Sequence, residues 1–206
     1  MTTNVLAGQF GANEGGALWA RRAGMVVLGV AALWISAKTK VEIGAVPITM
    51  QVLVIMAMSM AYGSRMAAAT LIAYLAAGAA GWPVFAGTPE KGIGLVYMLG
   101  STGGYLVGFV GAAWLVGWLA ERGWDRNMFT TALTMALGLT VIYACGVLWL
   151  AYGFPITAFG SSFAGFGIGK GLEWGVFPFL WIDAIKVALA VIAFPAIWKL
   201  IGNRGV

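Results

Sequence analysis

The stretch from Pro178 to Pro195 is an apolar run that is long enough to cross a lipid bilayer. Several runs of this length follow one another along the chain. Their apolar residues are continuous, whereas the strands of an outer-membrane barrel alternate apolar and polar residues. Hydrophobic residues make up 61% of the chain and charged residues 9%, against about 25% charged residues in an ordinary soluble domain. With a mean hydropathy of +0.91, the sequence predicts an all-α integral membrane protein.

The spacing of the apolar runs predicts a six-transmembrane-helix bundle. A polar tail, 1–16, precedes a single membrane domain over 17–201, and a second short tail covers 202–206. The expected helices span 17–38, 46–62, 66–81, 95–120, 128–152 and 174–201. Two glycine-rich segments, 82–94 and 153–173, interrupt the pattern, and such irregular backbone is not tolerated where it faces lipid.

The distribution of basic residues predicts that both termini are cytoplasmic. An even number of helices places the termini on the same side, together with two of the five connections. That side carries Arg21, Arg22, Arg65, Arg122, Arg126, Lys199 and Arg204, and the other side carries Lys38, Lys40, Lys91 and Lys170. Under the positive-inside rule, the first set is cytoplasmic. The sequence thus predicts a multi-pass protein of the bacterial inner membrane, with segments 82–94 and 153–173 outside.

The residue types that are missing exclude most enzyme chemistry. The chain has no histidine and one cysteine, Cys145, so an intrachain disulfide and a Cys/His metal site are both excluded. Residues 165–171 contain glycines and Lys170 but lack the Ser or Thr of a nucleotide-binding P-loop. No basic run suggests nucleic acid. We expect no enzymatic activity, no cofactor and no metal.

Asp183 and Lys186 are the strongest candidates for a binding site. Ionised side chains at membrane depth are expensive and usually face a partner, a cavity or a ligand. Three residues apart, they share one helical face. They lie nine and twelve residues after Trp174, so ~13–18 Å along the helix. Two interpretations stay open: the pair binds a polar small molecule, or it locks helix packing.

Weaker candidates lie on the other expected helices and in the first irregular segment. Thr49 and Gln51 begin a helix on the outer side and can hydrogen-bond either a ligand or a neighbouring helix. Glycines around Gly104 either allow close helix packing or clear space for a flat ring system beside Tyr105. Phe85 either closes the site as part of a lid or anchors the loop at the membrane interface.

Five sequence segments are informative together: VPITMQ (46–51), WPVFAG (82–87), GSTGGYLVGF (100–109), AERG (120–123) and PFLWIDAIKVALA (178–190). In their order and spacing they resemble the BioY family, the biotin-specific substrate-capture (S) components of energy-coupling factor (ECF) vitamin transporters. The resemblance implies six membrane helices, an extracytoplasmic biotin pocket, and transport with or without a separate membrane coupling protein and two ATPase subunits.

The resemblance also assigns roles to individual residues. It implies that Asp183 accepts hydrogen bonds from the ureido group of biotin and that Lys186 contacts a polar end of the ligand, with Gln51 and Thr49 supplementing them. Phe85, Trp82 and Tyr105 would cover the rings, with Gly104 beside them. Family members dock on the coupling protein through small residues of the first helix, which here implies Ala32 and Ser36.

Three functional hypotheses follow. The first is high-affinity biotin binding and uptake, and the second is capture of another vitamin by the same architecture. The third is a membrane scaffold in which Asp183 and Lys186 form a structural pair. Whether the chain acts alone, as a homo-oligomer, or with energising subunits is left open by the sequence.

Overall fold

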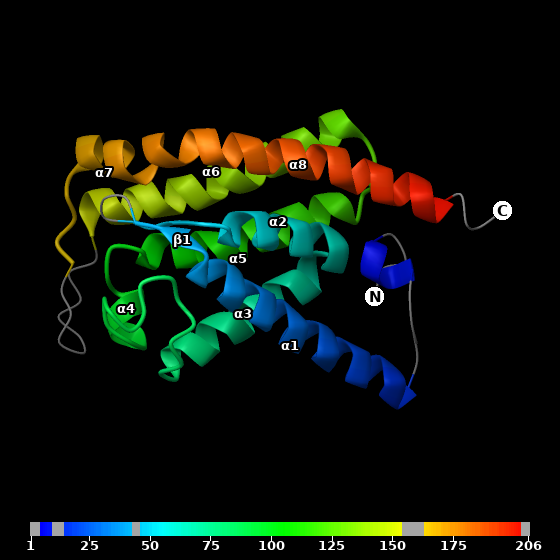
Figure 1. Cartoon of the computed structure of the whole chain (residues 1–206), viewed down its shortest axis with the longest axis horizontal. Coiled ribbons are helices and arrows are strands. Elements are labelled where there is room, and N and C mark those ends of the chain that lie inside the picture. The colour runs from blue at the N-terminus through cyan, green and yellow to red at the C-terminus, as the bar shows by residue number, and fades with distance from the viewer. Residues whose placement is uncertain (1–4, 10–14, 43–45, 154–162, 203–206) are drawn as a thin grey trace.

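The computed structural model describes residues 5–9, 15–42, 46–153 and 163–202, and these form a helical bundle (Figure 1). The elements are η1 (Leu6–Gln9), α1 (Gly15–Lys38), β1 (Lys40–Val41), β2 (Ile48–Thr49), α2 (Gln51–Tyr62), α3 (Ser64–Ala79), α4 (Leu95–Met98), α5 (Gly103–Ala120), α6 (Met128–Tyr152), α7 (Ile168–Gly175) and α8 (Phe177–Gly202). Of the described chain, four helical segments are long and apolar enough to cross a membrane, namely α1, α5, α6 and the α7–α8 segment. The helical membrane architecture is confirmed at this level.

The helix expected over 46–62 begins five residues later than predicted, at Gln51. Residues Lys40–Val41 and Ile48–Thr49 instead pair as a short antiparallel hairpin, with Lys40 opposite Thr49. Proline restricts the residue before it to extended backbone, and the β-branched residues nearby favour the same conformation. Pro47 therefore lies in an extended approach to the helix and not in its first turn.

The helix expected over 95–120 is broken, and α4 and α5 are separated by the turn 99–102. The carbonyl of Gly100, which a continuous helix would give to the amide of residue 104, accepts a hydrogen bond from Trp149 Nε1 at 2.9 Å. The break brings Tyr97 of α4 and Tyr105 of α5 to the same cavity. The last expected helix, 174–201, is likewise divided at Val176 into α7 and α8.

Helix α5 is the buried centre of the bundle. Glycines on one side let α6 approach closely, since a Cβ on Gly104 would lie 2.2 Å from Cβ of Trp149 and 2.4 Å from the carbonyl oxygen of Cys145. At the other end, a Cβ on Gly117 would lie 2.4 Å from the amide nitrogen of Ser64. Backbone-to-backbone packing of this kind requires residues without a side chain.

Two polar contacts tie the end of the bundle that holds η1 and the last turn of α8, on the right in Figure 1. Trp198 Nε1 donates to Asp125 Oδ2 at 2.6 Å, and the amide of Ser64 donates to Glu121 Oε1 at 2.9 Å. Asp125 lies in the turn between α5 and α6, where burial raises the pKa of its carboxyl. Both contacts fix the C-terminal end of α5.

Part of the segment predicted as a polar tail is packed against the bundle. Within η1 and the residue before it, Val5 is buried and Leu6 packs on the hydrophobic core beside α2. The apolar side chains of Val5 and Leu6 explain this packing. The rest of the predicted tail, 1–4 and 10–14, and residues 203–206 lie outside the described residues.

The buried residues of α8 between 177 and 201 fall on one stripe. Its members are spaced three or four residues apart, as one helical face requires, and they are Phe179, Asp183, Lys186, Ala190, Phe194 and the adjacent Pro195. Most other side chains of this helix are exposed, including Trp181, Ile185 and Leu189. The only two charges in the apolar part of α8 therefore face the bundle interior.

Candidate functional site

A cavity lies between α2, α5, α6 and α8, at the end of the bundle that carries the β1–β2 hairpin, α4 and α7. It measures about 50 Å³, which is room for a few water molecules. Helices form most of its wall, and the hairpin, the loop 82–94 and Thr102 of the turn between α4 and α5 form the remainder. Polar side chains of several elements converge on an otherwise apolar lining, which is the usual composition of a small-molecule site.

Asp183 and Lys186 meet in this cavity as a buried ion pair. Lys186 Nζ lies 2.6 Å from Asp183 Oδ1, and each side chain is about 2% exposed. Lys186 also donates to the backbone oxygen of Thr49 at 2.8 Å, which ties α8 to β2. Asp183 Oδ2 accepts a 2.5 Å hydrogen bond from Tyr143 Oη of α6. Three elements thus converge on one carboxylate and one ammonium group.

Both members of the pair have hydrogen-bonding positions beyond those that they use in the described structure. A carboxylate offers about four lone-pair positions and an ammonium three donors. Within the part of the chain that the structure describes, Lys186 uses two donors and Asp183 accepts two hydrogen bonds. The two groups can therefore bind a ligand that has both donors and acceptors without first separating.

Thr49 contacts Lys186 through its backbone, whereas Gln51 makes its contact through its side chain. The Thr49 hydroxyl accepts the amide hydrogen of Gln51 at 3.2 Å, so that its backbone oxygen, rather than its side chain, contacts Lys186. Gln51 Nε2 donates to Tyr74 Oη at 2.9 Å, and Tyr74 in turn donates to the backbone oxygen of Val84 at 2.9 Å. Gln51 is thereby connected to the loop 82–94.

Phe85 is the centre of that loop and faces inward. It is 1% exposed and stacks on Tyr97, with ring centroids 5.1 Å apart and an interplanar angle of 13°. Tyr74 meets it edge-on at 5.5 Å. Gly78 makes room for the ring, since a Cβ there would lie 2.0 Å from Phe85 Cζ. Phe85 and Ala86 line the cavity from this position.

Tyr105 lines the cavity from α5 and also fixes α7. Its hydroxyl donates to the backbone oxygen of Gly175 at 2.7 Å, and its ring lies 6.3 Å from that of Phe179. Of the predicted site residues, the structure therefore brings together six: Asp183, Lys186, Gln51, Thr49, Phe85 and Tyr105.

Two predicted site residues lie elsewhere. Trp82 is 61% exposed and does not line the cavity, because Val84, Phe85 and Ala86 turn inward after it. The anchor role that the sequence allowed for Phe85 thus suits Trp82 better. Gly104 packs against Trp149 and Cys145 of α6, so that its missing side chain serves helix packing rather than a ligand.

The predicted docking residues of α1 do not lie on its outward face. Ser36 is buried, and its hydroxyl donates to the backbone oxygen of Leu33 at 3.0 Å; Ala32 is half-buried. The residues of α1 that do face outward include Ala20, Gly24 and Leu28. The small-residue spacing of Ala32 and Ser36 therefore serves packing within the chain.

Tyr143 is a polar cavity residue that the sequence did not predict. It lies in the middle of α6 among apolar residues, where a lone tyrosine resembles an ordinary core residue. A signal existed: a phenol at membrane depth needs a hydrogen-bond partner, and a buried carboxylate on another helix provides one. Tyr74, Tyr97 and Thr102 also line the cavity and were not predicted to do so.

The charged residues of the hairpin, Lys40 and Glu42, form an ion pair with each other. Lys40 Nζ contacts Glu42 Oε1 at 2.8 Å, and this hydrogen bond lowers the pKa of the Glu42 carboxyl and raises that of Lys40. Because both groups are substantially exposed, solvent screens the pair and its stabilisation is small.

Comparisons with known proteins agree with this architecture. A sequence model of the BioY family matches residues 6–203. A probable biotin transporter BioY of Pyrococcus horikoshii is 36% identical over 173 residues, covering 84% of this chain and 93% of that protein. A biotin transporter BioY of Thermotoga maritima is 34% identical over 177 residues, covering 85% and 90%.

The fold is also similar to that of a solved membrane protein. The crystal structure of the S-component for biotin from an ECF-type ABC transporter matches 91% of this chain and 95% of that chain, with a TM-score of 0.73 and 21% sequence identity. At 21% sequence identity, this structural similarity supports the assignment of the fold alone.

Proposed function

Because this chain belongs to the BioY family, we propose that it binds biotin with high affinity and serves its uptake as the S component of an ECF-type transporter. This is a transport role and not an enzymatic one. The observation that carries the proposal is the buried Asp183–Lys186 pair, which faces a cavity and retains donors and acceptors for a ligand.

The chemistry of biotin suits this cavity. Its ureido group has two N–H donors and a carbonyl, its side chain ends in a carboxylate, and its ring system is apolar. Asp183 accepts from the ureido N–H groups, and the remaining donor of Lys186 contacts a ligand oxygen. Tyr143 holds the Asp183 carboxylate in place. Phe85 and Tyr105 then cover the rings.

We further propose that 17–201 is one membrane domain with six spans, formed by α1, α2, α3, α5, α6 and the α7–α8 segment. α2 has 12 residues and α3 has 16, so they are ~18 and ~24 Å long and shorter than a ~30 Å hydrocarbon core. The hairpin and the loop 82–94 would complete these spans within the protein, which satisfies their backbone groups away from lipid.

The same proposal places both termini in the cytoplasm of a bacterial cell and the cavity mouth outside. Its support is an aromatic and basic girdle at one end of the bundle. There, arginine stacks on tryptophan in the pairs Arg22–Trp19, Arg122–Trp118 and Arg126–Trp198. Such residues are typical of a membrane interface, and arginine of its cytoplasmic side.

The proposed partners are biotin, membrane lipid, a transmembrane coupling protein and two ATPase subunits. The outward face of α1, with Ala20 and Gly24, is the surface that leaves room for a second membrane helix. Association of several copies of this chain is the alternative for a protein that acts alone.

Titration calorimetry on the purified protein in detergent tests the function. We expect one biotin per chain, tight binding, and a rise in the melting temperature that grows with biotin concentration, because a ligand that binds the folded state stabilises it. Thiamine and riboflavin serve as controls. Binding of one of these instead of biotin would show that the ligand is another vitamin. Binding of none of the three would favour the hypothesis that the protein is a membrane scaffold with a structural Asp183–Lys186 pair.

Tyr143→Phe is expected to weaken biotin binding roughly 10-fold, since it removes a hydrogen bond to a buried carboxylate. Calorimetry measures the change in Kd. Tyr152→Phe is the matched control, because Tyr152 lies on the same helix but is 68% exposed. An unchanged Kd for Tyr143→Phe would show that this hydroxyl has no part in the site.

A further inference from the structure

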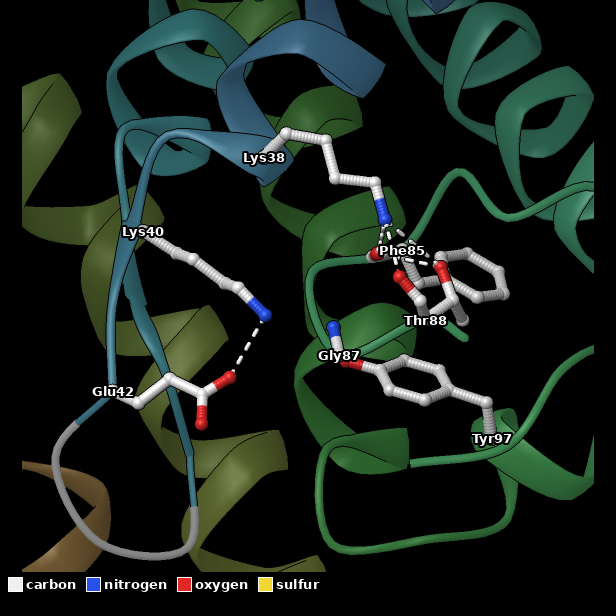
Figure 2. Close-up of polar contacts among 7 residues, drawn as sticks. All are labelled: Lys38, Lys40, Glu42, Phe85, Gly87, Thr88 and Tyr97. Atoms are coloured by element: carbon white, nitrogen blue, oxygen red, sulfur yellow. Dashed lines mark hydrogen bonds and ion pairs between the residues drawn. The ribbon is translucent and has the colours of Figure 1, made fainter. Parts of the chain in front are cut away.

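Lys38, the last residue of α1, reaches across to the loop 82–94 (Figure 2). Its Nζ donates to the backbone oxygen of Phe85 at 2.9 Å, to that of Thr88 at 2.6 Å and to Thr88 Oγ1 at 3.2 Å. The Thr88 hydroxyl also donates to the Phe85 oxygen at 2.7 Å. All three ammonium donors of Lys38, an exposed residue, thus contact one short turn through charge-assisted hydrogen bonds.

The turn that Lys38 holds is part of the cavity wall. Phe85 fills the slot at Gly78 between Tyr74 and Tyr97, and the amide of Gly87 donates to Tyr97 Oη at 3.1 Å. Around the rest of the cavity, the lining residues come from helices, from the β1–β2 hairpin and, for Thr102, from the short turn between α4 and α5. The loop is therefore a wall that can move without unpacking a transmembrane helix.

The size of the cavity requires some wall to move. At about 50 Å³, it holds a few water molecules, whereas a bicyclic vitamin with an acyl side chain is several times larger. Entry and exit therefore require displacement of the wall. Displacing the loop means withdrawing Phe85 and breaking the three hydrogen bonds of Lys38.

We propose that Lys38 is a positioning residue that latches the loop 82–94 over the site and sets the rate at which ligand enters and leaves. This inference rests on the proposed capture of biotin. Lys38 does not line the cavity, and its contacts hold the backbone behind Phe85, so it acts through the loop rather than on the ligand.

The latch has a kinetic signature that separates it from a direct ligand contact. Because Lys38 contacts the loop from outside the cavity, we expect the same three hydrogen bonds to hold the closed loop with and without ligand. Breaking them favours opening equally in both states, so association and dissociation accelerate together and their ratio stays constant. Loss of a direct contact would instead change the affinity, mainly through dissociation.

Exchange kinetics of labelled biotin test the latch with Lys38→Met, which keeps the length of the side chain and removes its donors. We expect both rate constants to rise about 10-fold, with Kd changed less than twofold. Lys40→Met is the matched control, because it removes a lysine two residues away whose partner, Glu42, lies on the same hairpin. Its rates should equal those of the wild type.

Thr88→Val provides a second variant in case Lys38→Met folds poorly. It removes the hydroxyl that accepts from Lys38 and donates to Phe85, and it should accelerate both rates by a smaller factor. Unchanged rates in Lys38→Met or, if that variant does not fold, in Thr88→Val would overturn the latch. So would an acceleration of dissociation alone, because that result would make Lys38 a ligand contact.

Hydrogen exchange of the ligand-free protein keeps this test independent of biotin. The amides of Thr88, Lys91 and Gly92 form hydrogen bonds within the loop and report its opening. Lys38→Met should exchange them about 10-fold faster than the wild type, and Lys40→Met should not. Equal exchange in all three proteins would refute the latch. Absence of biotin binding by the wild type would refute the proposed function alone.

Discussion

Asp183→Asn is expected to weaken biotin binding at least 100-fold. The substitution leaves the buried Lys186 ammonium without its carboxylate, and removing one partner of a buried ion pair costs about 3–5 kcal/mol. It also places an amide NH2 group where the ureido N–H groups need an acceptor. Lys186→Met should have an effect of similar size, because it leaves Asp183 uncompensated and removes the donor to Thr49. Calorimetry measures both losses.

The double variant Asp183→Asn with Lys186→Met separates ligand binding from structural support. Replacing both members of a buried pair by neutral residues is often neutral or stabilising. We therefore expect the double variant to regain most of the melting temperature lost in the single variants while its biotin binding remains lost. If each single variant lost stability but bound biotin as the wild type does, the pair would be structural and the ligand would bind elsewhere.

Gly104→Ala is expected to destabilise the fold and not to act on the site. A methyl group at this position would meet Cβ of Trp149 at 2.2 Å and the backbone oxygen of Cys145 at 2.4 Å, so α5 and α6 would have to separate. Overpacking of this kind costs about 1–3 kcal/mol or more. For a chain of this size, the melting temperature should fall by roughly 2–12 °C.

Gly111→Ala is the matched control on the same helix. Its new methyl group would lie 3.2 Å from Cγ1 of Val141, a side chain that can shift by a few tenths of an ångström. We expect melting temperatures close to that of the wild type for this variant. If the Gly104→Ala protein had the melting temperature of the wild type but bound biotin weakly, Gly104 would be part of the ligand site.

The sequence predicted most reliably what depends on local geometry. Asp183 and Lys186 share one helical face because they are three residues apart, and the structure places both on the buried stripe of α8. Apolar runs likewise identified the long helices. In both cases the prediction needed only the spacing of residues within a single helix.

Features that depend on packing between elements were not predictable in the same way. Gly104 fitted both a ligand gap and a helix contact, and only the position of Trp149 decides between them. Trp82 and Phe85 are neighbouring aromatics of one loop, and the slot at Gly78 determines that Phe85 turns inward. The role of Tyr143 depends on an acid forty positions away.

The ion pair within α8 has a consequence for biogenesis. Each ionised residue at the centre of an inserting helix costs about 2.5–3.5 kcal/mol on the scale measured with the translocon. Because Lys186 meets Asp183 one turn away at 2.6 Å, the pair can form inside this helix before any other helix packs on it. The apolar part of α8 can thus leave the translocon with no net charge, and its two polar head groups contact Tyr143 and Thr49 only when the other helices pack around them.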